Sequence, residues 1–155
     1  MKKLYTMVLV LFFALNLHAQ VQRPKLVVGL VVDQMRWDYL YFYQKEYGEG
    51  GLKRLLNNGF SFENMLINYS PTVTAIGHTS AYTGSIPALH GICGNNFWQN
   101  DKYIYCCDDS TVQSVGSQSK QGQMSPRRML STTIGDELRL ATDFRSKVIG
   151  VALKD

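Results

Sequence analysis

Apolar residues follow one another without interruption in two segments of the chain. The runs LVVGLVV, residues 26–32, and KVIGVAL, residues 147–153, are rich in β-branched side chains. Continuous runs of this kind are typical of parallel strands that are buried on both faces of a sheet. The segment FSFENMLINY, residues 60–69, alternates between apolar and polar positions, and this alternation predicts a further strand.

Other segments carry their apolar residues at helical spacing, and these are residues 36–48, 52–59, 75–84 and 131–142. The second ends at Gly59, the third is predicted to begin just after Thr74, and Ser131 or Thr132 is the expected cap of the fourth. Residues 108–125 are polar and predict an exposed loop. Strands that alternate with helices predict an α/β fold, with a mostly parallel sheet flanked by helices.

The beginning of the chain predicts a targeting segment. Two lysines precede a mostly apolar run, residues 4–17, and Ala19 is the small residue expected before a cleavage site. We therefore expect a signal peptide at residues 1–19, a mature chain from Gln20, and a periplasmic or secreted protein; a buried N-terminal helix or strand is the alternative. The run is shorter than the roughly 20 residues that span a bilayer, and no cysteine lies near the cleavage point, so we expect no stable membrane anchor.

The end of the chain predicts an unfinished sheet. No helix follows the apolar run at residues 147–153, although a parallel strand must be covered on both faces. We therefore expect residues 20–155 to form the N-terminal part of a longer domain, with a sheet that is incomplete at the C-terminus.

Charge and cysteine content exclude some functions. Without residues 1–19 the chain has 14 basic and 12 acidic residues, a net charge of +2 without a basic cluster, so a nucleic acid polymer is not an expected partner. Cys93, Cys106 and Cys107 fit no zinc-binding spacing. A disulfide from Cys93 to one of the other two and free buried thiols both remain open.

Two residues have the chemistry and the position of site residues. Asp33 follows the run at residues 26–32, at the strand end where ligands bind in parallel sheets; it is either a metal ligand or general base, or the cap of the next helix. Thr74 precedes a helix, where free N–H groups suit a phosphate. Its hydroxyl is either a nucleophile activated by a base or a metal, or a helix cap.

A family resemblance bears on these alternatives. The segments VVDQM, PTVTAIGHTSAYTG, PALHGICGNN and KVIGVALKD occur in this order, and together they resemble the alkaline phosphatase superfamily. In particular, the chain resembles its secreted phosphate-irrepressible alkaline phosphatases, which are close relatives of the nucleotide pyrophosphatase/phosphodiesterases. The resemblance extends from Leu26 to Asp155.

The resemblance implies a role for each matching residue. It implies that Asp33 is a zinc ligand, and that Thr74 is both a zinc ligand and the nucleophile that forms a covalent phosphothreonine. Asn95 matches the residue that binds a phosphate oxygen; without the resemblance it is a turn residue beside Gly94. A pair of zinc ions is implied, with their other ligands outside this chain. The histidines His78 and His90 are expected to hydrogen-bond the loops around the nucleophile.

Lys154 bears on the substrate class. It matches a phosphate-binding lysine of the monoesterases in the family, whose Lys-Asp-Arg motif is here Lys154 and Asp155. The expected function is metal-dependent hydrolysis of small-molecule phosphate monoesters by the full-length protein, with this chain inactive alone. A type I phosphodiesterase or nucleotide pyrophosphatase is the first alternative, and a truncated, non-catalytic secreted remnant is the second.

Overall fold

The computed structural model describes residues 24–154, so the signal peptide predicted at residues 1–19 lies outside the described residues. The chain divides into two units, Met1–Val31 and Val32–Asp155. In the first unit, residues 24–31 are extended, and Leu26 is 78% exposed. The prediction of a buried strand over residues 26–32 is therefore wrong for the described structure, because no neighbouring described segment pairs with this run.

The second unit begins with two short helices. Helix α2, Tyr39–Phe42, is followed by turns, so most of the helix predicted over residues 36–48 is not formed. Helix α3, Gly51–Asn58, ends at Gly59 as predicted. Residues 60–69, predicted as a strand, form turns and irregular backbone. A strand is stabilised by pairing with a neighbouring strand, and residues 60–69 have no such neighbour among the described residues.

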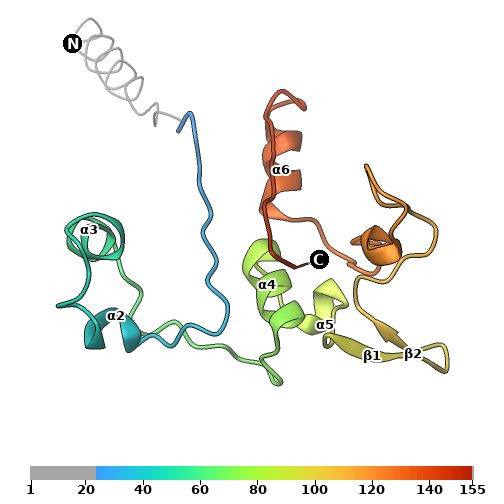
Figure 1. Cartoon of the computed structure of the whole chain (residues 1–155), viewed down its shortest axis with the longest axis horizontal. Helices are drawn as coiled ribbons and strands as arrows, with labels where there is room; N and C mark the ends of the chain where they lie inside the picture. Colours follow the sequence, from blue (N-terminus) through green and yellow to red (C-terminus); the bar gives the residue numbers. More distant parts are fainter. Residues whose placement is uncertain (1–23, 155) are drawn as a thin grey trace, which may run out of the picture. The chain divides into compact units, whose positions relative to one another are not determined.

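The centre of the second unit is built from two helices that pack together (Figure 1). Helix α4, Thr74–Thr83, begins at Thr74, one residue before the predicted start. It ends at Gly84, whose φ of 64° is left-handed, as is common at helix C-termini. Helix α5, Pro87–His90, follows after a short turn and begins with a proline, which suits the first turn of a helix.

A β-hairpin follows α5. Strand β1, Asn96–Gln99, pairs antiparallel with β2, Lys102–Tyr105, and these form the single sheet of residues 24–154. Asn100 and Asp101 both have positive φ, 51° and 60°, as a tight hairpin turn requires. The mostly parallel sheet predicted from the sequence is thus absent from the described part of the chain, where the extended runs at its two ends have no ladder partners.

The remaining chain is a loop and a helix. Residues 108–125 form turns and the short 3₁₀ helix η2, Lys120–Gly122, as predicted for a polar loop. Helix α6, Ile134–Ala141, packs against α4 (Figure 1). Its cap is Thr133, rather than Ser131 or Thr132, because Thr133 forms a reciprocal capping box with Asp136.

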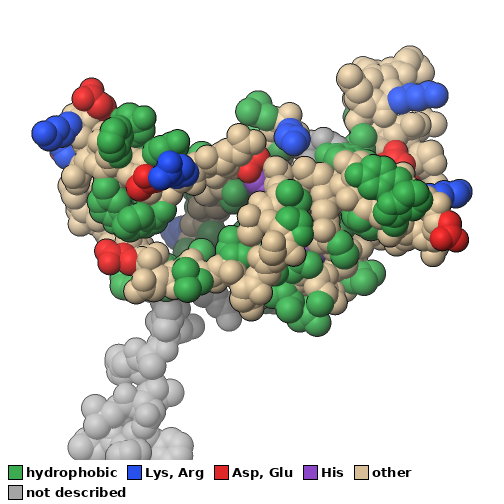
Figure 2. Space-filling view, turned by 90° about the horizontal axis from the view of Figure 1, so that it is seen from below, with side chains coloured by type: hydrophobic (Ala, Val, Ile, Leu, Met, Phe, Trp, Pro, Cys, Tyr) green, Lys and Arg blue, Asp and Glu red, His purple; other side chains and the backbone are tan. Residues whose placement is uncertain are grey.

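The buried core is small and surrounds α4 and α5. Its apolar members are Ile76 of α4, which is 1% exposed, together with Ile92 and Cys106. Many other large apolar side chains are exposed, and Figure 2 shows hydrophobic side chains over much of the face in view. The core therefore lies against α4, the helix that begins with Thr74.

Candidate active site

Thr74 is the first residue of α4 and does not cap it. The cap position is occupied by Val73, whose backbone is extended and whose side chain makes no capping hydrogen bond. The Thr74 hydroxyl instead donates to Asp33 Oδ2 over 3.2 Å. The alternative that Thr74 serves only as a helix cap is therefore excluded by the geometry.

Asp33 is held near this hydroxyl by the chain that follows the extended run. It does not cap a helix, since the residue at the N-cap of α2 is Asp38. Its carboxylate is exposed and accepts the hydrogen bond from Thr74 across 41 residues of sequence. A hydroxyl and a carboxylate oxygen thus meet at the N-terminus of α4, where the helix dipole favours negative charge.

Asn95 lies at the same helix terminus. Its side-chain Oδ1 accepts the backbone N–H of Ala75 over 2.9 Å, and its backbone oxygen accepts the N–H of Cys106 over 2.8 Å. Because Oδ1 already accepts from the helix, the hydrogen-bonding capacity that remains on this side chain includes the two Nδ2 donors. Asn95 therefore presents amide donors at the end of α4 that begins with Thr74.

Lys154 is not joined to these residues in the described structure. It is exposed and lies in the extended segment that follows α6. Within residues 24–154, no hydrogen bond or ion pair connects it to Thr74, Asp33 or Asn95. The structure thus brings three of the four predicted site residues together, and the roles of all four stay predictions.

Both histidines form hydrogen bonds near Thr74, but only His90 contacts a loop as expected, whereas the contact of His78 lies within α4 itself. His78 lies one turn after Thr74, with its Nδ1 2.9 Å from the Thr74 carbonyl oxygen. His90 is completely buried at the end of α5. Its Nε2 lies 3.0 Å from Ser80 Oγ of α4, and its Nδ1 accepts the N–H of Ile92 over 3.2 Å.

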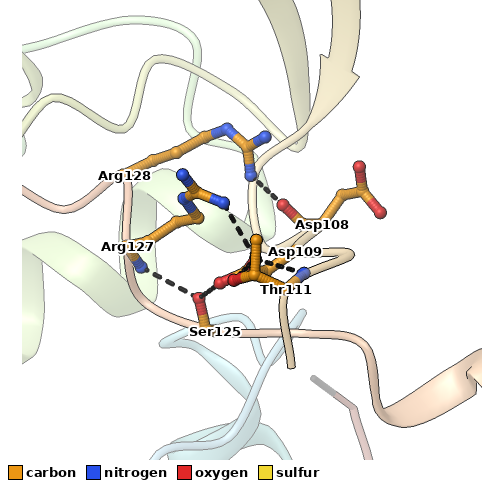
Figure 3. A network of polar contacts seen from close by, with 6 residues as sticks. All are labelled: Asp108, Asp109, Thr111, Ser125, Arg127 and Arg128. Atoms are coloured by element: carbon orange, nitrogen blue, oxygen red, sulfur yellow. Dashed lines mark hydrogen bonds and ion pairs between the residues drawn. The ribbon is translucent and has the colours of Figure 1, made fainter. Parts of the chain in front are cut away.

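A buried carboxylate organises the loop after the hairpin, and the sequence reasoning did not identify it. Asp109 is 4% exposed, and its side chain accepts hydrogen bonds from Thr111 and Ser125 and pairs with Arg127 at 2.9 Å (Figure 3). The Ser125 and Thr111 hydroxyls are the main reasons that the pKa of Asp109 lies well below its ordinary value. The clustering of Asp, Ser, Thr and Arg in residues 108–128 was the available signal.

The cysteines do not form the disulfide that the sequence left open for Cys93. Cys93 is exposed and has a free thiol. Cys106 is buried, and its Sγ lies 3.6 Å from Cys107 Sγ, which is too long for a disulfide bond.

Residues 24–154 contain no cluster of three or more His, Cys, Asp or Glu side chains that could hold a metal ion. None of the helices described for this chain has the length and hydrophobicity needed to cross a membrane.

Comparison with known proteins adds to this geometry. Residues 27–146 match the family of type I phosphodiesterases / nucleotide pyrophosphatases. Alkaline phosphatase PhoV of Synechococcus elongatus is 61% identical over 137 residues, which cover 87% of this chain and 25% of that protein. Alkaline phosphatase PafA of Elizabethkingia meningoseptica is 62% identical over 138 residues, again 87% of this chain and 25% of the relative.

A solved structure agrees with the described fold. The crystal structure of wild-type alkaline phosphatase PafA superimposes with a TM-score of 0.84 at 62% identity, covering 87% of this chain and 26% of that chain. This match confirms the predicted fold class, α/β of the alkaline phosphatase type. The chain spans about a quarter of the length of the relatives it matches.

Proposed function

Because the chain belongs to the type I phosphodiesterase / nucleotide pyrophosphatase family, we propose that the full-length protein hydrolyses phosphate monoesters through Thr74. The names of the matched relatives, alkaline phosphatases PhoV and PafA, support a monoesterase. The observation that carries the proposal is the placement of the Thr74 hydroxyl 3.2 Å from Asp33 at the start of α4.

A divalent metal ion fits the two oxygens of this site. Zinc binds oxygen ligands at about 2.0–2.2 Å, so two ligands of one tetrahedral ion lie roughly 3.4 Å apart. The observed separation of 3.2 Å between Thr74 Oγ1 and Asp33 Oδ2 is close to that value. We propose that Asp33 and Thr74 contribute to a zinc site that is completed by ligands beyond the described residues. A bound zinc ion supplies positive charge that lowers the pKa of the Thr74 hydroxyl and stabilises the developing negative charge of the reaction.

The residues of the chain then have distinct roles. Thr74 Oγ attacks phosphorus, so that a Thr–O–P bond forms while the bond from phosphorus to the ester oxygen breaks. The proton of the Thr74 hydroxyl passes to solvent, and the departing alkoxide takes a proton from solvent to leave as the alcohol. Water then hydrolyses the phosphothreonine, which releases phosphate and restores the hydroxyl. The first turn of α4 adds a favourable dipole for the anionic group.

Asn95 and Lys154 are proposed to bind the phosphoryl oxygens. The Nδ2 hydrogens of Asn95 donate without adding charge, because Oδ1 already accepts from Ala75. Lys154 provides a positive charge that favours a dianionic monoester over a monoanionic diester. The second candidate function, hydrolysis of phosphodiesters, is favoured by the family description itself and differs in needing no such cation.

Two further proposals concern the protein as a whole. We propose that it is exported to the periplasm or the cell exterior by residues 1–19 and acts there on small-molecule phosphate esters. We also propose that residues 20–155 alone are inactive, because two oxygen ligands do not complete a zinc site. Zinc-dependent phosphatase activity of that polypeptide would contradict the second proposal.

The test compares the full-length protein with two threonine variants. With zinc present, we expect the protein to hydrolyse p-nitrophenyl phosphate faster than bis(p-nitrophenyl) phosphate. We expect Thr74→Ala to abolish turnover, and also to abolish the acid-stable labelling of the protein by a ³²P-phosphoryl donor. Thr72→Ala is the matched control, since Thr72 is exposed two residues earlier. A Thr74→Ala protein with wild-type turnover, or a Thr72→Ala protein that is equally inactive, would refute the proposal.

A further inference from the structure

His90 has both ring nitrogens engaged in the small core. A backbone N–H can only donate, so the contact with Ile92 N requires Nδ1 of His90 to be the acceptor. The neutral ring therefore carries its hydrogen on Nε2 and donates it to Ser80 Oγ, 3.0 Å away. Burial lowers the pKa of His90, which favours this neutral form.

These two hydrogen bonds join the parts of the candidate site. Ser80 belongs to α4, the helix that begins with Thr74, whereas Ile92 belongs to the segment that leads to Asn95. The backbone oxygen of His90 also accepts the N–H of Leu130 over 3.0 Å. A single buried side chain thus connects the nucleophile helix to the segment that carries the phosphate-binding amide.

We propose that His90 is a positioning residue that fixes Asn95 against the N-terminus of α4. Its bond to Ser80 holds the 90–95 segment at the middle of the helix, and the bond from Ala75 N to Asn95 Oδ1 holds the same segment at the helix start. These two hydrogen bonds to one helix fix both the distance of the Asn95 side chain from α4 and its direction relative to the helix. The hydrogen bonds of His90 reach neither Thr74 nor Asp33, so it acts through Asn95.

The inference rests on the proposed function, because a precise position for Asn95 matters only if its amide binds a phosphoryl group. Displacement of a catalytic group by about 1 Å can reduce a rate on the order of 100-fold. A purely structural histidine would have a different signature, since its loss would lower the melting temperature and leave kcat unchanged in the folded protein.

The experiment uses the full-length protein and two substitutions that each keep one hydrogen bond. His90→Gln places an amide N–H near the Nε2 position and preserves the donor to Ser80. His90→Asn places an amide oxygen near the Nδ1 position and preserves only the acceptor for Ile92. With p-nitrophenyl phosphate as substrate, we expect kcat to fall about 10- to 100-fold in His90→Asn. Ser80→Ala should reduce kcat by the same factor, whereas His90→Gln should reduce it much less.

A double-mutant comparison tests whether His90 acts through Asn95. In an Asn95→Ala background, His90→Asn should change kcat less than about twofold, because residues that act as one unit are not additive. A full loss in that background, or a His90→Asn protein with wild-type kcat and only a lowered melting temperature, would overturn the inference.

A second readout separates this inference from the proposed function. Hydrogen exchange of the Ala75 amide, which donates to Asn95, should accelerate in His90→Asn and Ser80→Ala but not in His90→Gln, whether or not the protein is a phosphatase. Unchanged Ala75 exchange in all three variants would overturn the inference. An inactive wild-type protein that shows the expected exchange pattern would overturn the proposed function alone.

Discussion

Gly91 offers a test of how closely the segment after α5 is packed. Its φ of 81° is left-handed, and a Cβ added there would lie 2.8 Å from Leu130 Cγ and 3.2 Å from the Arg128 carbonyl oxygen. Gly84 is the matched control, because its φ of 64° is also left-handed but an added Cβ would meet no atom within 4 Å. The two substitutions to alanine thus share the backbone cost and differ in the steric one.

The expected magnitudes follow from these two costs. A left-handed backbone costs a non-glycine residue about 1–2 kcal/mol, and overpacking typically adds about 1–3 kcal/mol. Gly84→Ala should therefore lower the free energy of local opening by about 1–2 kcal/mol, and Gly91→Ala by about 2–5 kcal/mol. Because the segment after Gly91 leads to Asn95, only Gly91→Ala should also reduce kcat/KM.

The assay is hydrogen exchange of the amides in residues 74–95 of the full-length protein, which reports the free energy of local opening. Leu130→Ala is the relief variant, since this side chain is 76% exposed and supplies the nearest clashing atoms. In a Leu130→Ala background the cost of Gly91→Ala should fall toward that of Gly84→Ala. Equal costs for the two glycine substitutions in the wild-type background would refute the reasoning.

Three further outcomes are expected. Thr133→Ala should destabilise α6 by about 1 kcal/mol through loss of its capping box, measured by amide exchange, and unchanged exchange of the α6 amides would contradict this role of Thr133. The folded pKa of Asp109 is lowered, so its stabilising contribution is complete above the unfolded pKa of about 3.9 and is lost as pH falls toward the folded value. Urea midpoints of wild type and Asp109→Asn should therefore converge on acidification, and a constant difference would contradict this cause. Lys154→Ala should reduce kcat/KM for p-nitrophenyl phosphate far more than for its diester, and equal losses would remove Lys154 from substrate discrimination.

Local pattern predicted the helices better than the strands. Helices α3 and α4 could be predicted because helical spacing and the glycines at their ends are properties of one segment. The runs at residues 26–32 and 60–69 have strand character, but a strand also needs a hydrogen-bonded neighbour, and no local pattern specifies one. The hairpin was missed although Asn100 and Asp101 are suitable turn residues and the segments on both sides contain aromatic residues.

The candidate site could be predicted only in part from local chemistry. From its position alone, Asp33 was equally well interpreted as a ligand or as a helix cap, and Asn95 was interpreted as a turn residue. The contacts that decide between these interpretations are long-range. Asp33 contacts Thr74 across 41 residues, and Asn95 contacts Ala75 across 20. The resemblance to a known family supplied that long-range information. It did not supply the buried Asp109 network, whose members are close in the loop but are not part of the quoted motifs.

Two threonines at helix starts explain how one residue type serves structure in one place and chemistry in another. Thr133 is the cap of α6, and its hydroxyl accepts from the N–H of Asp136, whose carboxylate accepts from Thr133 in return. Thr74 lies one position further into its helix, after the extended Val73, and the residue at the third helical position of α4 carries no carboxylate. Its hydroxyl is therefore not engaged by the helix and donates to an acid from elsewhere in the chain. Asn95 satisfies the N–H donor of α4 that a local cap would otherwise have satisfied. A shift of one residue in register, together with an amide supplied from outside the helix, leaves this hydroxyl available for the proposed attack on phosphorus.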